Sequence, residues 1–364
     1  MHLETSVLRA FRLTLGLALL GATALIGGCS SDAGGAAVAA ADAGSGADAA
    51  FGSDAGADAA LASDAGADTA AVASDTASDT AAADASTVSD VTTGCVPSAA
   101  STAPKTLGGA RPAKVYVPKT WDGCTKLPLV ILLHGYGASG GIQDAYLGVS
   151  ARVDKLGFIA VVPDGTVSKI GKQFWNATNA CCDFDGQKID DVAYLRGLIT
   201  EAHTALAVDP ERVYFYGHSN GGFMSYRMAC EASDLVTGIA SLAGAVANNA
   251  ALCKPARPVS VLQIHGTLDA TIAYQGNLYY PSAIAAEGRW LALNGCTGAL
   301  KTEDDGDFDN GVPGAETSRR FHDECDEGTW VGLWTMTGSG HIPQVTQPFN
   351  DAVLEQVLAW RRQP

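Results

Sequence analysis

The chain has 364 residues and a formal net charge of −16, from 39 acidic and 23 basic side chains. Residues 31–94 carry −11 of that charge, whereas residues 95–364 carry only −6. A folded region with so modest a charge gives no support for nucleic-acid binding, and it is long enough for one large domain with a substantial core.

The chain begins with a segment, residues 1–29, that resembles an export signal. Arg9 and Arg12 precede an apolar run that is short for a membrane span and ends in small residues before Cys29. Small residues directly before a cysteine are typical of the lipobox of bacterial lipoproteins. We therefore expect lipidation at Cys29 and a location at the cell surface, held to the membrane through that anchor alone. The alternative is an ordinary signal peptide with a chance cysteine.

The next segment, residues 30–94, is dominated by Ala, Asp, Gly, Ser and Thr. It holds eleven Asp, no Lys or Arg, and two near-identical repeats, at 53–60 and 63–70. Such a composition cannot bury enough apolar surface to offset the entropy lost on ordering. We expect a disordered, self-repelling spacer.

Residues 95–364 alternate between short apolar runs and helical patterns. The runs predict buried strands at Ala113–Val117, Leu129–Leu133, Phe158–Val162, Val213–Tyr216, Ile239–Leu242, Val259–Ile264 and Val331–Met336. The patterns predict helices at Val192–Ala207, capped by Asp190 or Asp191, at Gly221–Glu231 and at Asp351–Arg361. This alternation predicts an α/β fold, a mainly parallel sheet with helices on both faces, with reactive residues at the carboxyl ends of strands.

One strand runs into a helix through the sequence Gly217-His218-Ser219-Asn220-Gly221. A G-x-S-x-G motif between a strand and a helix forces its serine into a strained turn that exposes the hydroxyl, and side chains two residues away on either side clash there. We expect Ser219 to be a nucleophile. The alternative is a glycine-rich turn whose serine caps the helix.

A serine nucleophile needs an imidazole base. Three histidines follow Ser219 in the sequence, and His341 lies just after the last strand, in a glycine-rich loop. We expect His341 to be the base and His265 to be its main rival, with a structural role in the loop after its strand. His322 lies in a charged segment that we expect to be exposed.

The base in turn needs a carboxylate that orients it. Asp269 follows a strand and precedes the loop of His341, so we expect it to fix the tautomer of that histidine. Two amides are expected to bind the oxyanion: that of Asn220, after the nucleophile, and that of Tyr136, in the loop after an early strand. For His134-Gly135 a tight turn is the alternative.

These motifs, in their order, resemble those of the polyhydroxybutyrate-depolymerase-type esterases, which include feruloyl and acetylxylan esterases. The motifs that carry the resemblance are His134-Gly135-Tyr136, Trp175-Asn176, Cys181-Cys182, Asp190-Asp191-Val192, Gly217–Gly222, His265–Asp269, Trp290 with Asn294-Gly295-Cys296, and Gly340-His341. The resemblance implies an α/β-hydrolase fold, the triad Ser219–Asp269–His341, the Tyr136 and Asn220 oxyanion amides, and a Cys296–Cys325 disulfide.

The chain departs from that family beside the base. Ile342 and Pro343 follow His341, where family members often have a tryptophan, and this difference affects the substrate pocket rather than the mechanism. We expect Tyr136 and Trp175 to line the pocket. Trp290 is a further candidate, although packing in the core explains it as well.

Cysteines and acidic residues raise the alternative of a metal site. Eight cysteines remain after Cys29, and in an exported region they favour disulfides over zinc, with Cys95–Cys124 the next pairing after Cys296–Cys325. Four acidic residues match a calcium-loop register, but its glycine is replaced and no helix clearly precedes it. These are Asp305, Asp307, Asp309 and Glu316. We expect an acidic surface loop, and no metal or organic cofactor.

Together these features predict a monomeric serine esterase acting on feruloyl or acetyl esters of a plant polysaccharide. A polyhydroxybutyrate depolymerase is the alternative substrate class. A peptidase with the same triad and a non-catalytic binding protein are the alternatives of other classes.

Overall fold

The computed structural model describes residues 95–363. The expected signal segment, the lipidation site at Cys29 and the spacer at residues 30–94 lie outside these residues. Within the described part of the chain, no helix is long and apolar enough to cross a membrane.

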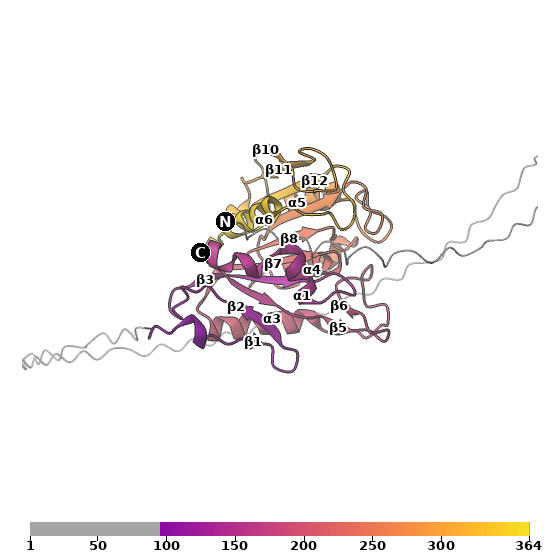
Figure 1. Ribbon diagram of the computed structural model, residues 1–364. Helices are drawn as coiled ribbons and strands as arrows, with labels where there is room; N and C mark the ends of the chain where they lie inside the picture. Colours follow the sequence, from indigo (N-terminus) through magenta and orange to yellow (C-terminus); the bar gives the residue numbers. More distant parts are fainter. Residues whose placement is uncertain (1–94, 364) are drawn as a thin grey trace, which may run out of the picture. The chain divides into compact units, whose positions relative to one another are not determined.

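A ten-stranded sheet forms the centre of the fold (Figure 1). In spatial order its strands are β1 (Thr106–Leu107), β2 (Ala113–Tyr116), β4 (Ile159–Val162), β3 (Leu127–Leu133), β7 (Val208–His218), β8 (Gly238–Leu242), β9 (Ser260–Gly266), β12 (Val331–Met336), β11 (Thr317–His322) and β10 (Lys301–Gly306). The six strands from β4 to β12 are parallel, and antiparallel strands flank them at both edges. All seven predicted strands belong to this sheet.

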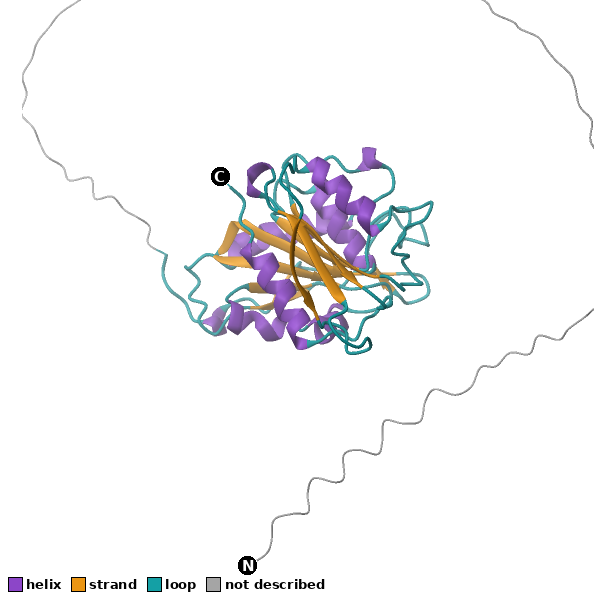
Figure 2. Ribbon diagram, turned by 90° about the horizontal axis from the view of Figure 1, so that it is seen from above, coloured by secondary structure: helices purple, strands orange, loops and turns teal. Residues whose placement is uncertain are grey.

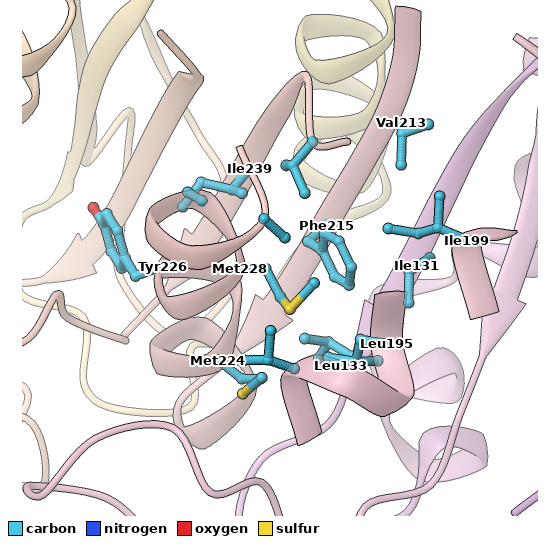
Figure 3. Packing of buried hydrophobic residues seen from close by; sticks show 14 of the residues in the cluster. Ile131, Leu133, Leu195, Ile199, Val213, Phe215, Met224, Tyr226, Met228 and Ile239 are labelled. Atoms are coloured by element: carbon cyan, nitrogen blue, oxygen red, sulfur yellow. The ribbon is translucent and has the colours of Figure 1, made fainter. Parts of the chain in front are cut away.

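Helices cover both faces of the sheet (Figure 2). One face packs on α3 (Asp191–Ala205), α4 (Asn220–Glu231) and α5 (Ala283–Leu293), and the other packs on α1 (Gly140–Leu147), α2 (Val153–Leu156) and α6 (Gln347–Ala359). Successive residues along a central strand point to opposite faces of the sheet, so each strand contributes side chains to two separate hydrophobic cores. In Figure 3, Phe215 and Leu133 of the strands lie toward Met228 and Met224 of α4, and Ile131 lies beside Ile199 of α3. This is the α/β-hydrolase fold that the sequence predicts.

Smaller elements complete the chain. A hairpin of β5 (Thr166–Val167) and β6 (Gln173–Phe174) forms a separate sheet, and short 3₁₀ helices lie at Ala100–Thr102, Ser150–Arg152, Ala250–Leu252 and Asp326–Gly328. Asp190 caps α3 as expected by accepting a hydrogen bond from the Ala193 amide. Asp191 does not cap the helix; its buried carboxylate is paired with Arg111 at 2.8 Å.

The order in which successive strands are added to the sheet changes direction between β3 and β7. From β3 the chain moves outward to β4, then returns to place β7 on the other side of β3. Ligands of open α/β sheets bind at such a switch point, outside the carboxyl ends of the strands. Pairing of Leu133 with Gly217 sets the loop after β3 beside the turn after β7.

Four disulfides join the eight cysteines of the described residues. They are Cys95–Cys124, Cys181–Cys182, Cys230–Cys253 and Cys296–Cys325, and they include both pairings that the sequence analysis expected. Four disulfides are consistent with an oxidising compartment.

We predict that two of these disulfides, which close loops of the same length, differ in their contribution to stability. Cys95–Cys124 and Cys296–Cys325 each span 29 residues, for which chain entropy alone gives about 3–4 kcal/mol. Cys95 is exposed and precedes every helix and strand of the described residues, 95–363. Cutting its disulfide therefore frees the segment around Cys95 in the folded state as well, which offsets part of the freedom that the unfolded chain gains. The double Cys→Ser variant at 296 and 325 should therefore lose more unfolding free energy in urea than that at 95 and 124; equal losses would contradict this prediction.

Candidate active site

The turn from β7 into α4 places Ser219 in a strained backbone conformation, with φ 54° and ψ −119°. Few L-residues adopt a positive φ, and strain of this kind concentrates at functional sites. The Ser219 amide donates to the Leu242 carbonyl of β8 at 2.8 Å, which ties the turn to the neighbouring strand. The conformation leaves the serine side chain partly exposed at the carboxyl edge of the sheet.

Glycines make this turn sterically possible. A Cβ on Gly217 would collide with the Gly221 carbonyl, and a Cβ on Gly221 would collide with the carbonyl of Leu133 in β3. A Cβ on Gly135 would lie 3.4 Å from that of Ser219, so the loop after β3 approaches the serine closely. The glycines of the motif therefore serve close backbone approach around Ser219.

Three side chains from three different loops form one hydrogen-bonded chain. His341 Nε2 lies 2.9 Å from Ser219 Oγ, and His341 Nδ1 lies 2.8 Å from Asp269 Oδ2. An imidazole bonded in this way takes the serine proton on one nitrogen while the carboxylate orients the other. The structure thus brings together Ser219, Asp269 and His341 in the arrangement expected from the sequence.

Adjacent strands bring Asp269 and His341 together. Gly266 at the end of β9 pairs with Met336 at the end of β12, so the loops that follow begin side by side. The Leu268 amide donates to the Ser339 carbonyl at 3.0 Å and binds the two loops to each other.

Asp269 is held as a carboxylate. Burial alone disfavours its charge, but hydrogen bonds from His265, His341 and the Ile272 amide outweigh burial and hold the pKa of Asp269 well below its ordinary value. The Thr271 and Ile272 amides both donate to its Oδ1 at 2.8 Å. In a serine–histidine–aspartate triad, a carboxylate in this position stabilises the imidazolium.

His265, the rival base, contacts Asp269 and not Ser219. Gln263 fixes its tautomer, because the Gln263 side-chain amide donates to the Gly244 carbonyl and so presents its N–H to His265 Nδ1 at 3.0 Å. His265 Nε2 therefore carries the proton, and it lies 2.7 Å from the Ile272 carbonyl and 3.3 Å from Asp269 Oδ2. His265 shapes the loop of Asp269, which is the structural role expected for it. His322 lies in β11, half-buried rather than exposed as expected, with Nδ1 3.0 Å from the Gly298 carbonyl.

Of the two expected oxyanion amides, that of Tyr136 lies in the loop after β3 and that of Asn220 at the first residue of α4, directly after Ser219. Within residues 95–363, neither the Tyr136 amide nor the Asn220 amide donates a hydrogen bond, so both are free for a ligand. The Asn220 side chain exchanges two hydrogen bonds with the Trp175 backbone, at 2.7 and 2.9 Å. His134 accepts a hydrogen bond from the Gly165 amide at 2.8 Å and anchors the loop that carries Tyr136.

Two aromatic residues expected in the pocket wall lie elsewhere. Trp175 and Trp290 have no exposed surface, so the prediction that Trp175 faces a ligand is wrong, and for Trp290 the alternative of packing in the core is confirmed. Trp175 packs against His134, and Trp290 stacks on Tyr226 within the core. Tyr136 is partly exposed as expected, and its ring contacts Phe184, a residue that the sequence analysis did not single out.

The acidic segment after β10 is less exposed than expected. Asp309 and Glu316 are buried, and their carboxylates accept hydrogen bonds from the amides of Gly311 and Gln344 and from that of Phe308. Asp305 lies in β10, not in a loop. Among the described residues, no group of three or more His, Cys, Asp or Glu side chains could hold a metal ion.

Comparison with known proteins places these features among esterases. A sequence profile of the phospholipase/carboxylesterase family matches residues 124–281. Feruloyl esterase B of Piromyces equi is 30% identical over 62% of this chain, but the match spans only 42% of that enzyme. The putative esterase NocK of Nocardia uniformis subsp. tsuyamanensis is 30% identical over 62% of this chain and 69% of that protein.

A solved structure agrees in fold. An acetyl xylan esterase from Aspergillus awamori superposes with a TM-score of 0.51 at 16% identity, and the alignment covers 69% of this chain and 97% of that enzyme. At this identity the likeness supports the fold alone.

The site predicts a specific pH dependence of stability. Burial lowers the pKa of His218, which precedes Ser219, from 6.5 to about 4. Between these values the unfolded chain binds a proton that the folded chain does not, so stability is full above pH 6.5 and is lost as the pH falls toward 4. The contribution is about 3 kcal/mol. Urea unfolding at pH 7 and at pH 4.5 should show a smaller loss in H218Q than in the wild type, and equal losses would contradict the pKa shift.

Proposed function

We propose that this chain, which belongs to the esterases of the α/β-hydrolase fold, is a carboxylic ester hydrolase. Its proposed substrates are feruloyl esters of plant polysaccharide, with acetyl esters next. The observation that carries the proposal is the hydrogen-bonded chain from Asp269 through His341 to Ser219. The name and identity of the Piromyces equi relative support the feruloyl group.

In the proposed acylation, His341 Nε2 takes the Ser219 proton as Oγ attacks the ester carbonyl carbon. The carbonyl oxygen becomes an oxyanion, which accepts hydrogen bonds from the Tyr136 and Asn220 amides. The bond to the alcohol then breaks, and His341 gives its proton to the leaving oxygen. An acyl group remains on Ser219.

In the proposed deacylation, water takes the place of the alcohol. His341 removes a proton from the water, whose oxygen attacks the acyl carbon, and the same two amides hold the second oxyanion. The bond to Ser219 Oγ breaks as His341 returns the proton, which releases the acid and restores the enzyme. Asp269 keeps its negative charge throughout and stabilises the imidazolium in both halves of the cycle.

An aromatic pair beside the expected oxyanion amide suits a feruloyl ring. Tyr136 and Phe184 meet edge to face with ring centroids 5.4 Å apart, and Phe184 is 72% exposed. An aromatic acyl group bound there would replace water on the open face of Phe184 while its ester lies near the Tyr136 amide.

A second substrate class, a polyester such as polyhydroxybutyrate, is favoured by apolar side chains next to the triad. Leu268 precedes Asp269 and is 68% exposed, and Ile342 follows His341 and is 67% exposed. Exposed apolar side chains beside the proposed catalytic residues suit the binding of an apolar polymer chain.

For the whole protein we propose export and a lipid anchor at Cys29, with residues 30–94 as a spacer between membrane and enzyme. The four disulfides of the catalytic domain support a location outside the cytoplasm. We propose that the enzyme acts as a monomer.

Replacing the proposed nucleophile tests the mechanism. S219A should lower kcat for p-nitrophenyl acetate by at least about a thousandfold, because no other group forms the acyl-enzyme. S282A removes a serine that caps α5 and should leave the rate unchanged. Initial rates and circular dichroism of both variants give the comparison; an active, folded S219A would refute the assignment.

The substrate class is tested with three esters: methyl ferulate, acetylated xylan and a hydroxybutyrate oligomer. We expect kcat/KM to be highest for methyl ferulate. In F184A that value should fall by about 3–10-fold, the loss of one aromatic contact, with little change for p-nitrophenyl acetate. I170A, which truncates a side chain that is 73% exposed, is the matched control. Equal effects of F184A on both esters would exclude an aromatic acyl site at this position.

A further inference from the structure

The proposed mechanism does not use His218, the residue between Gly217 and the nucleophile. Its side chain is buried at the end of β7, and its Nε2 lies 2.9 Å from the backbone carbonyl of His341. The rings of His218 and His341 lie 5.1 Å apart. His218 therefore touches the backbone of the proposed base while being covalently bonded to the proposed nucleophile.

The direction of this hydrogen bond follows from its acceptor. A carbonyl oxygen only accepts, so His218 Nε2 carries the proton and donates. Burial keeps the imidazole neutral at neutral pH, because its pKa is lowered to about 4. His218 thus supplies one fixed N–H and no charge at the back of the site.

Tyr146 of α1 makes a second contact of the same kind. Its hydroxyl donates to the Pro343 carbonyl at 2.7 Å, and its ring packs edge to face on that of His218 at 5.6 Å. Two donors from two different elements therefore hold the carbonyls on either side of Ile342.

The remainder of the His341 loop, residues 337–346, is fixed only at its ends. Ser339 accepts from the Leu268 amide on one side, and the Gln344 amide donates to buried Asp309 at 2.9 Å on the other. Among the described residues, the His341 backbone makes no hydrogen bond except the one to His218. The backbone at His341 is consequently held by that single contact and by the neighbouring one to Tyr146, whereas the imidazole itself is oriented by Asp269.

We propose that His218, assisted by Tyr146, is a positioning residue that holds the His341 loop so that Nε2 of His341 stays on the Ser219 hydroxyl. The inference rests on the proposed roles of Ser219 and His341. Because His218 adjoins Ser219 in the chain, its hydrogen bond links the backbones of nucleophile and base directly. Misplacement of a reacting group by about 1 Å can cost about a hundredfold in rate.

Two substitutions of His218 distinguish the contribution of its hydrogen bond from that of its side-chain volume. The side-chain amide nitrogen of glutamine reaches as far as Nε2 of histidine, whereas that of asparagine reaches only as far as Nδ1. We expect kcat of H218N to fall by about 10–100-fold with KM within about twofold, and H218Q to recover to within about threefold of the wild type. Thermal melts and circular dichroism of both variants check that they are folded.

Tyr146 offers an independent variant with a matched control. Y146F should lower kcat by about 3–10-fold, the worth of one hydrogen bond. Y194F also removes a hydroxyl that donates to a backbone carbonyl, that of Arg111 at 2.8 Å, and should leave kcat unchanged. In the double variant H218N/Y146F the loss should be smaller than the product of the single losses, because the loop is already free.

Equal kcat values for H218N and H218Q would overturn the inference, as would wild-type kcat in H218N. A crystal structure of H218N tests it without reference to activity: the distance from His341 Nε2 to Ser219 Oγ should exceed 3.5 Å, or His341 should occupy two positions. An unchanged distance would also overturn it. Esterase activity that persists in S219A would instead refute the proposed function, so the two failures are distinguishable.

Discussion

At the end of β7 three stretches of backbone meet with no room for a side chain between them. The Cβ positions of Gly217 and Gly221 are already occupied by carbonyl groups, and Gly135 lies against Ser219. This steric constraint bends the chain, gives Ser219 its positive φ, and brings the Tyr136 loop to the same point. The energetic cost of such a conformation is met by the packed sheet on both sides, because β7 lies between β3 and β8 in the centre of the parallel strands.

The polar groups around this point differ in burial: Ser219 and His341 are partly exposed, whereas Asp269, His218 and His265 are buried. The partly exposed histidine exchanges protons in the proposed reaction, whereas the tautomer of each buried histidine is fixed by a hydrogen bond. A low dielectric strengthens such bonds and makes an unpaired group costly, which keeps the geometry unique.

Much of the fold was predictable because the central strands are apolar on both faces, which gives continuous runs such as Leu129–Leu133. The antiparallel β10 and β11 were missed since their sequences, KTEDDG and TSRRFH, are polar and mostly outside the core. Helices α1, α2 and α5 were not among the predicted helices either. The order of Ser219, Asp269 and His341 along the strands was readable from sequence, but the burial of Trp175, Asp309 and Glu316 was not. Those depend on contacts between residues far apart in the chain, which no local pattern encodes.

The central claim is that His341 activates Ser219 across the 2.9 Å hydrogen bond between them. Mass spectrometry after brief exposure to a fluorophosphonate tests it directly, because this reagent phosphonylates only an activated serine. We predict a single adduct, on the peptide that contains Ser219. We also predict labelling at least about a hundredfold slower when His341 is replaced by alanine, because loss of a catalytic base typically lowers the rate by that factor. An adduct on another serine, or unchanged labelling without His341, would contradict it.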